Sequence, residues 1–174
     1  RQRLLVSTTT APCATASVER LKELGWPVVL FFSNSNIWPP EEYERRLAAT
    51  RKLAGRLDVP LVADEYDHDD WLRAVRGLEK EPERGRRCEA CFRYNLRQAA
   101  TYAEKHGFDA FTTTLTISPH KKSELIFAVG RELGEFLEEN FKKRDGFRRS
   151  LAMSREMNLY RQSYCGCEFS RENR

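Results

Sequence analysis

The sequence has no long apolar run, no internal repeat and no low-complexity linker. A membrane-spanning helix needs about 20 consecutive apolar residues, and no stretch of this chain approaches that length. The opening residues through Val6 are also too short for a secretory signal peptide. We therefore expect a cytoplasmic protein without a membrane partner, folded as a single domain over residues 1–174.

Cysteine is scarce and odd in number, which argues against a disulfide framework. Five cysteines occur in 174 residues, and a chain of this length can bury well over half of its unfolded surface without covalent cross-links. In a chain without a secretory signal, an odd number of cysteines points to metal binding or redox chemistry.

Four of the five cysteines form two close pairs. Cys88 and Cys91 make a Cys-x-x-Cys pair, and Cys165 and Cys167 flank Gly166. Glycine between two thiolates lets both face one ion or cluster, because it accepts unusual backbone dihedrals. Four thiolates suit either a structural zinc ion or a cubic iron–sulfur cluster, and the spacing does not decide between them. Two independent pairs of structural thiols are the alternative.

Strand and helix patterns alternate along the chain. Strands are expected over residues 4–6, 28–32, 60–63, 110–115 and, more briefly, 136–141; helices are expected over 12–25, 40–57, 69–76, 89–106, 122–133 and 146–157. Val28–Phe32 is almost continuously apolar, as in a strand buried on both faces of a parallel sheet. We predict an α/β fold in which helices cover both faces of an open parallel sheet.

The first helix and the strand-end loops give two sharper expectations. Val18, Leu21 and Leu24 should face the core from the first helix. In an open parallel sheet, ligands bind beyond the carboxyl ends of the strands. The loops expected there cover residues 7–13, 33–39, 64–70 and 116–122. Cys13 lies in the first of them and is a fifth candidate metal ligand.

The loop after the first strand lacks glycine. Thr8, Thr9 and Thr10 precede Pro12, where the next helix should begin and where free backbone N–H groups attract anions. A phosphate loop generally needs glycines so that the backbone can approach its ligand, and their absence counts against an ATP-dependent tRNA-thiolating enzyme. Threonine hydroxyls capping the helix are the structural alternative.

Acid–base and basic residues gather in two further stretches. Tyr66, Asp67 and His68 follow the third strand and are candidates for acid–base chemistry, whereas Asp69 and Asp70 are expected to cap the next helix. Positive charge gathers between residues 142 and 161 in Lys142, Lys143, Arg144, Arg148, Arg149, Arg155 and Arg161. Such a block either binds phosphates or forms a solvated helix face.

Taken together, the motifs resemble the non-cobalamin epoxyqueuosine reductases of the QueH type, over nearly the whole chain. The matching segments are Asn36-Ile37-Trp38-Pro39, Glu42-Tyr43 with Arg46, Tyr66-Asp67 with Trp71, Arg87 to Phe92, Phe111 to Lys121, Asp145-Gly146 with Arg149-Ser150, and Leu159 to Cys167. The resemblance implies a fold like that of adenine-nucleotide alpha hydrolases and reduction of epoxyqueuosine to queuosine in tRNA. It also implies a four-iron four-sulfur cluster with an adjacent single iron.

The sequence departs from that family pattern after the first strand. Family members usually carry His-x-Cys-Cys-Ala-Pro-Cys there, so Thr9 and Thr10 occupy two expected thiol positions. Threonine hydroxyls are poor iron ligands compared with thiolates. The alternative to an active reductase is therefore a catalytically silent relative that binds tRNA and keeps a structural metal.

The resemblance also suggests roles for individual residues. Removing an epoxide oxygen takes two electrons and two protons, so an external electron donor is expected. The expected cluster ligands are Cys88, Cys91, Cys165 and Cys167, with Cys13 as a further metal ligand. The expected proton donors are Tyr66, Asp67 and Tyr164. The residues expected to contact RNA, by stacking or through phosphates, are Trp38, Lys121, Arg148, Arg149, Tyr160 and Arg161.

Overall fold

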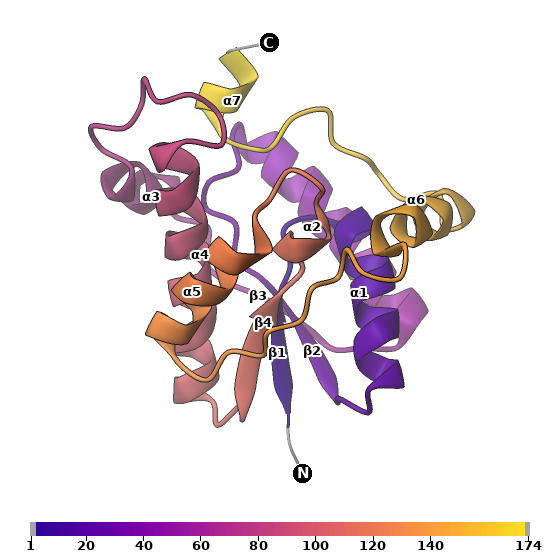
Figure 1. Ribbon diagram of the computed structural model, residues 1–174. Helices are drawn as coiled ribbons and strands as arrows, with labels where there is room; N and C mark the ends of the chain where they lie inside the picture. The colour runs from indigo at the N-terminus through magenta and orange to yellow at the C-terminus, as the bar shows by residue number, and fades with distance from the viewer. Residues whose placement is uncertain (1–2, 173–174) are drawn as a thin grey trace.

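A parallel β-sheet lies at the centre of the structure, a computed structural model that describes residues 3–172 (Figure 1). Within those residues four strands form the sheet: β1 (Leu4–Ser7), β2 (Val28–Phe32), β3 (Leu61–Ala63) and β4 (Ala110–Thr113). Their order is β3-β2-β1-β4, and every neighbouring pair is parallel. The predicted parallel α/β architecture is confirmed.

Helices connect the strands, with ends close to those expected. They are α1 (Ala11–Glu23), α2 (Pro40–Leu57), α3 (His68–Ala74), α4 (Arg86–Lys105), the 3₁₀ helix η1 (Leu115–Ile117), α5 (Ser123–Leu133), α6 (Gly146–Glu156) and α7 (Glu168–Glu172). The short helices η1 and α7 are additions to the sequence prediction. Across residues 3–172, no helix has both the length and the apolar character that crossing a membrane requires.

Side chains of β1 alternate between two cores, which shows that helices cover both faces of the sheet. Leu4 and Val6 pack with apolar residues of α1 and α2, whereas Leu5 packs with those of α4 and α5. Successive side chains of a strand point to opposite faces, so both sets are buried at once. Figure 1 shows α1 and α6 on one side of the sheet and α4 and α5 on the other.

The strand order locates the place where a ligand is expected. From β1 the chain continues through β2 to β3 on one side, and β4 then pairs with the other edge of β1. The connections therefore reverse direction between β1 and β4. In doubly wound sheets the loops at the carboxyl ends of such strands separate and leave a crevice for a ligand.

The prediction that Leu24 faces the core is wrong. Leu24 is the residue that caps α1, immediately before Gly25 with φ 86°, and 46% of its surface is exposed. The chain has left the helical path at this point, so the apolar stripe containing Val18 and Leu21 ends before Leu24.

The predicted strand over residues 136–141 is also wrong. Phe136 makes an isolated parallel bridge to Phe111, but the following residues form no strand within the described chain. Beyond the bridge, the backbone oxygens of residues 137 and 139 bind side chains and not a strand. The Thr112 hydroxyl donates to the Leu137 oxygen, and the Thr116 hydroxyl donates to the Glu139 oxygen. The backbone of β4 turns into η1 at this point and no longer offers an extended edge.

Gly130 of α5 provides a test of this packing. A Cβ on Gly130 would lie 2.4 Å from the Phe136 ring, whereas a Cβ on Gly55 of α2 meets nothing within 4 Å. We expect Gly130→Ala to lower the free energy of unfolding by about 1–3 kcal/mol through overpacking. The matched control Gly55→Ala should raise it by about 0.5–1 kcal/mol, because alanine favours the helix. Urea denaturation measures both, and equal effects would contradict the described packing of Phe136.

Candidate metal centre and active-site cavity

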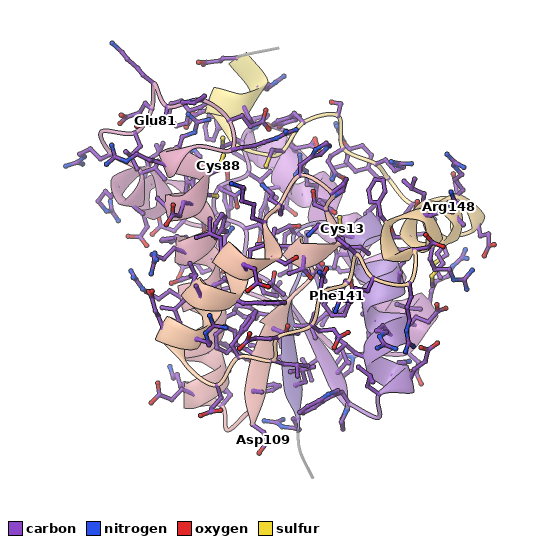
Figure 2. The ribbon with its side chains drawn as sticks, in the orientation of Figure 1. Cys13, Glu81, Cys88, Asp109, Phe141 and Arg148 are labelled. Atoms are coloured by element: carbon purple, nitrogen blue, oxygen red, sulfur yellow. The ribbon has the colours of Figure 1, made fainter. Side chains whose placement is uncertain are left out.

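A cavity of about 510 Å³ lies at the carboxyl edge of the sheet. Its walls come from the loops after β1, β2 and β4, the start of α4, and residues 161–167. Cys13 and Cys88 lie toward this edge in Figure 2, and Asp109 lies at the opposite end of the molecule. The site therefore coincides with the reversal between β1 and β4 at which a ligand is expected.

All five cysteines line this cavity as free thiols. Cys165 is the common neighbour: its thiol influences the pKa values of Cys91 and Cys13, and the thiols of Cys88 and Cys167 influence its own. The two pairs that the sequence separates by more than seventy residues are therefore brought together. Cys13 lines the same cavity, and the Cys165 thiol influences its pKa.

Three of the thiols have raised pKa values. Burial raises the pKa values of Cys13, Cys91 and Cys165, and neighbouring thiols raise them further. Cys165 is open to solvent at the mouth of the cavity, yet protein atoms crowd its sulfur closely enough to raise its pKa. Metal ligation requires thiolates, so a bound metal must displace these protons.

The arrangement suits a bulky thiolate-ligated group better than a single ion. Among residues 3–172, no three Cys, His, Asp or Glu side chains come close enough together to hold one metal ion. All five thiols line a cavity of about 510 Å³. A cubic iron–sulfur cluster occupies more space than an ion and takes four thiolates, so this donor set fits it.

Unpaired polar atoms indicate that the cavity is built to hold a ligand. Six buried side-chain atoms of residues 3–172 lack a hydrogen-bond partner, and they belong to Thr10, Trp71, Arg87, Asn95 and Thr114. All five residues line this cavity. Buried polar groups in native proteins are normally paired, so a set of unpaired ones around one space points to a missing partner.

Positive charge in the cavity indicates that the ligand is anionic. Arg87 is 1% exposed and donates through Nη1 to the carbonyl oxygens of Glu79 and Glu81, but its Nε and Nη2 atoms have no partner in the described chain. Burial lowers the pKa of Lys121, but negative charge on the sulfurs of Cys165 and Cys88 raises it by more, so the net shift is upward. Buried charges require a counter-charge, which metal-bound thiolates provide.

Arg46 of α2 holds the segment that contains the second cysteine pair. Its guanidinium is 2% exposed and donates to the backbone oxygens of Cys165 at 2.8 Å and Tyr164 at 3.0 Å. Its Nε atom donates to Glu42 at 3.2 Å, and Glu42 also accepts the Tyr160 hydroxyl at 2.6 Å. Glu42 and Arg46, which are one helical turn apart on α2, form a buried ion pair that positions the Cys-Gly-Cys turn.

Gly166 makes this close approach possible. Its φ of 149° is in a region that residues with side chains rarely adopt, as the sequence suggests. A Cβ there would lie 3.2 Å from both Arg46 Nη1 and Asn36 Nδ2. The Gly166 carbonyl accepts the backbone N–H of Trp38 at 2.9 Å, and the Tyr164 hydroxyl donates to the Trp38 carbonyl.

Two of the three predicted proton donors lie outside the cavity. The Tyr66 hydroxyl donates to the Ile37 carbonyl, and burial raises the pKa of Tyr66 to about 12. Asp67 caps α3 by accepting the backbone N–H of Asp70 at 3.0 Å, so the expectation that Asp69 and Asp70 form the cap is wrong. Asp67 has a non-helical backbone immediately before the helix, which lets its carboxylate accept the N–H of Asp70. Tyr164 does line the cavity.

His68 links three segments. Its Nδ1 atom donates to the Ser35 carbonyl at 2.7 Å, and its Nε2 atom lies 2.9 Å from a carboxylate oxygen of Glu168 in α7. Trp38 stacks on its ring at 4.8 Å and remains 37% exposed. His68 therefore holds α7 and the loop after β2 beside α3.

Comparison with known proteins identifies the family. The sequence profile described as "Epoxyqueuosine reductase QueH" matches residues 4–173. The chain belongs to this family. The epoxyqueuosine reductase QueH of Streptococcus pyogenes is 39% identical over 98% of this chain and 71% of its own length. The QueH proteins of Haemophilus influenzae and Thermotoga maritima are 34% and 36% identical, over 97% and 80% of this chain and 71% and 77% of their own lengths.

Thr9 and Thr10, the positions at which cysteines are expected from the family resemblance, both line the cavity. Thr10 precedes α1 as its N-cap residue, but its hydroxyl makes no capping hydrogen bond and has no partner among the described residues. The helix-capping alternative is therefore wrong for Thr10. Its hydroxyl lies beside the Cys13 thiol and lowers that thiol's pKa slightly against the dominant effect of burial.

The residues predicted to contact RNA fall into two places in this QueH chain. Lys121 and Arg161 line the thiol cavity. Arg148 and Arg149 lie on α6 beside a second groove of about 550 Å³ that α1 and α6 share. Arg149 is held by the carboxylate of Glu19 at 3.0 and 3.2 Å, whereas Arg148 projects from α6 with its side chain exposed (Figure 2).

Several residues of the site could not be recognised as such from the sequence. Glu42 and Arg46 are four residues apart on a helix, a spacing that favours an ion pair but does not reveal a distant partner. Arg87 and Asn95 look like ordinary polar residues of α4. Their burial depends on segments far away in the chain, which local patterns do not report.

Removal of the Arg46 side chain tests the anchoring of the cysteine turn. We expect Arg46→Met to lower the free energy of unfolding by about 3 kcal/mol, because it leaves Glu42 as a buried charge without its cation. Hydrogen exchange over residues 159–167 should also become faster. The matched control is Arg45→Met, which removes an exposed arginine that pairs with the same carboxylate at 3.4 Å. The control should change neither quantity measurably, and equal effects of the two substitutions would contradict this role of Arg46.

Proposed function

We propose that this chain reduces epoxyqueuosine to queuosine in a tRNA. The observation that carries the proposal is the convergence of both cysteine pairs on one cavity in a chain of the epoxyqueuosine reductase QueH family. The relatives named above carry that activity in their names. The proposal includes a cytoplasmic location, an external electron donor and the finer fold class of the adenine-nucleotide alpha hydrolases.

Cys88, Cys91, Cys165 and Cys167 would hold a four-iron four-sulfur cluster. Such a cluster, when bound, passes electrons one at a time from the external donor to the substrate. The proposal does not extend to a second, single iron. Thr9 and Thr10 offer hydroxyls where thiolates would be needed, and Cys13 alone is a poor donor set for iron.

The reaction needs protons and an oriented substrate in addition to electrons. Two electrons and two protons convert the epoxide into an alkene, as both carbon–oxygen bonds break and the oxygen leaves as water. Of the predicted proton donors Tyr164 is the one that lines the cavity, and burial raises its pKa, so it keeps its hydroxyl proton at neutral pH. To donate that proton to the substrate, the hydroxyl would leave its hydrogen bond to the Trp38 carbonyl. The positive charge of Lys121, which lines the cavity, would stabilise the negative charge that develops on the departing oxygen.

Exposed basic and aromatic residues around the cavity would hold the RNA. Arg161 lies at the cavity and Arg148 on α6, so phosphates on both sides of the modified base could be contacted. Trp38 and Tyr160 flank the Cys-Gly-Cys segment and offer aromatic faces for stacking.

Substitution of single cysteines tests the assignment of ligands. After anaerobic reconstitution we expect about four irons and four sulfides per chain in the wild type, and a large loss of both in Cys165→Ser. The matched control Cys13→Ser should retain iron and sulfide, because Cys13 belongs to neither of the two cysteine pairs proposed as ligands. Chemical analysis of iron, sulfide and zinc measures this.

The reconstituted samples are then assayed for reduction of epoxyqueuosine in tRNA. The wild type should convert epoxyqueuosine-containing tRNA under a strong one-electron reductant. Zinc without sulfide would overturn the proposed cluster. A full cluster without turnover would identify the chain as a silent relative, in line with Thr9 and Thr10.

The two α6 arginines should differ in their effect on tRNA binding. We expect Arg148→Ala to weaken binding and to reduce the slope of log affinity against log salt by about 1, as loss of one phosphate contact does. Arg149→Ala should have a smaller effect, because Glu19 already neutralises that side chain. Filter binding at several salt concentrations measures both slopes. An unchanged slope for Arg148→Ala would remove α6 from the RNA interface.

A further inference from the structure

Trp71 of α3 is held in one orientation beside the cysteines. Its side chain is 0% exposed. The indole stacks against the His68 ring at 5.5 Å and 19° on one side and packs near the Phe169 ring at 6.2 Å and 29°. Both neighbours are fixed in turn, since His68 bonds to Ser35 and to Glu168, the residue before Phe169. The direction of the indole N–H is therefore set by packing.

This N–H group has no conventional acceptor. Trp71 Nε1 is buried, lines the thiol cavity and finds no hydrogen-bond partner within residues 3–172. An unsatisfied buried donor costs about 1–3 kcal/mol. A tryptophan retained at such a cost is expected to gain its partner when the cavity is filled.

The sulfur of Cys91 is a candidate acceptor. Cys91, Cys167 and Trp71 pack in the same small apolar cluster. Burial raises the pKa of Cys91 most strongly, and the nearby Trp71 side chain acts against that rise, which agrees with the packing of the two residues in one cluster. A protonated thiol is a weak acceptor, but a thiolate accepts hydrogen bonds well. A metal-bound Cys91 sulfur would therefore be a suitable acceptor for the Trp71 N–H.

We propose that Trp71 is a positioning residue that donates its indole N–H to the Cys91 sulfur of the bound iron–sulfur cluster and thereby raises the cluster's reduction potential. This inference rests on the proposed function. Reduction adds one electron, and its negative charge is shared with the ligating sulfurs. A donor directed at one of those sulfurs stabilises the reduced form more than the oxidised form.

The first test compares reduction potentials. Trp71→Phe keeps an aromatic ring in the stack and removes the N–H. The matched control is Trp26→Phe, because Trp26 precedes β2 at the end of the sheet away from the cavity. Each reconstituted protein is titrated anaerobically with dithionite in the presence of mediator dyes. We expect a more negative midpoint potential for Trp71→Phe at unchanged iron and sulfide content, and an unchanged potential for the control.

The second test uses the wild-type protein, so it remains decisive if Trp71→Phe does not fold. The protein is produced with tryptophan labelled with ¹⁵N at the indole nitrogen and is reduced with dithionite. Pulsed electron paramagnetic resonance should then detect a hyperfine coupling from a labelled indole nitrogen and its exchangeable proton. Absence of this coupling overturns the hydrogen bond, and a coupling without any shift in potential overturns its effect on reduction.

Failure of the inference can be separated from failure of the proposed function. A wild-type protein that binds iron and sulfide, but shows the same potential after Trp71→Phe and no indole coupling, overturns the role of Trp71 alone. A wild-type protein without iron and sulfide after reconstitution overturns both.

Discussion

The buried pair of Glu42 and Arg46 is the interaction on which the geometry of the site depends. The two cysteines at 165 and 167 belong to a segment with little regular structure, which by itself would sample many conformations. Arg46 restricts it by binding two successive backbone carbonyls, and Gly166 allows the approach because it has no side chain. Burying the Arg46 guanidinium costs desolvation free energy, and its hydrogen bonds determine the position of Cys165 and Cys167.

The other half of the site depends on the sheet. The strand reversal between β1 and β4 opens the space, and the first turn of α4 brings Cys88 and Cys91 to its wall. Around this space the protein leaves several polar groups unpaired, including the buried guanidinium of Arg87. Such groups weaken the folded state without a ligand, and they define the polarity and charge of what the cavity accepts.

Local patterns predicted most of the fold, because apolar periodicity reflects which residues are buried. They failed where tertiary contacts determine the backbone conformation. Leu24 lies just past the end of α1. Over residues 136–141, hydrogen bonds from threonine hydroxyls of β4 and η1 take the place of the predicted strand pairing. The cysteine spacing indicated the candidate metal centre. It gave no sign of Arg46, Arg87 or the direction of the Trp71 N–H, since each depends on segments that meet only in three dimensions.

The order of the segments along the chain also sets an order of assembly. The sheet, α2 and the first cysteine pair are all synthesised before Cys165 and Cys167, and the sheet has its strands and covering helices without the final segment. The last segment adds Cys167 and Phe169 to the apolar cluster around Trp71. On the ribosome, the second cysteine pair would therefore be the last part of the site to be made, and a cofactor held by both pairs would be inserted only after that.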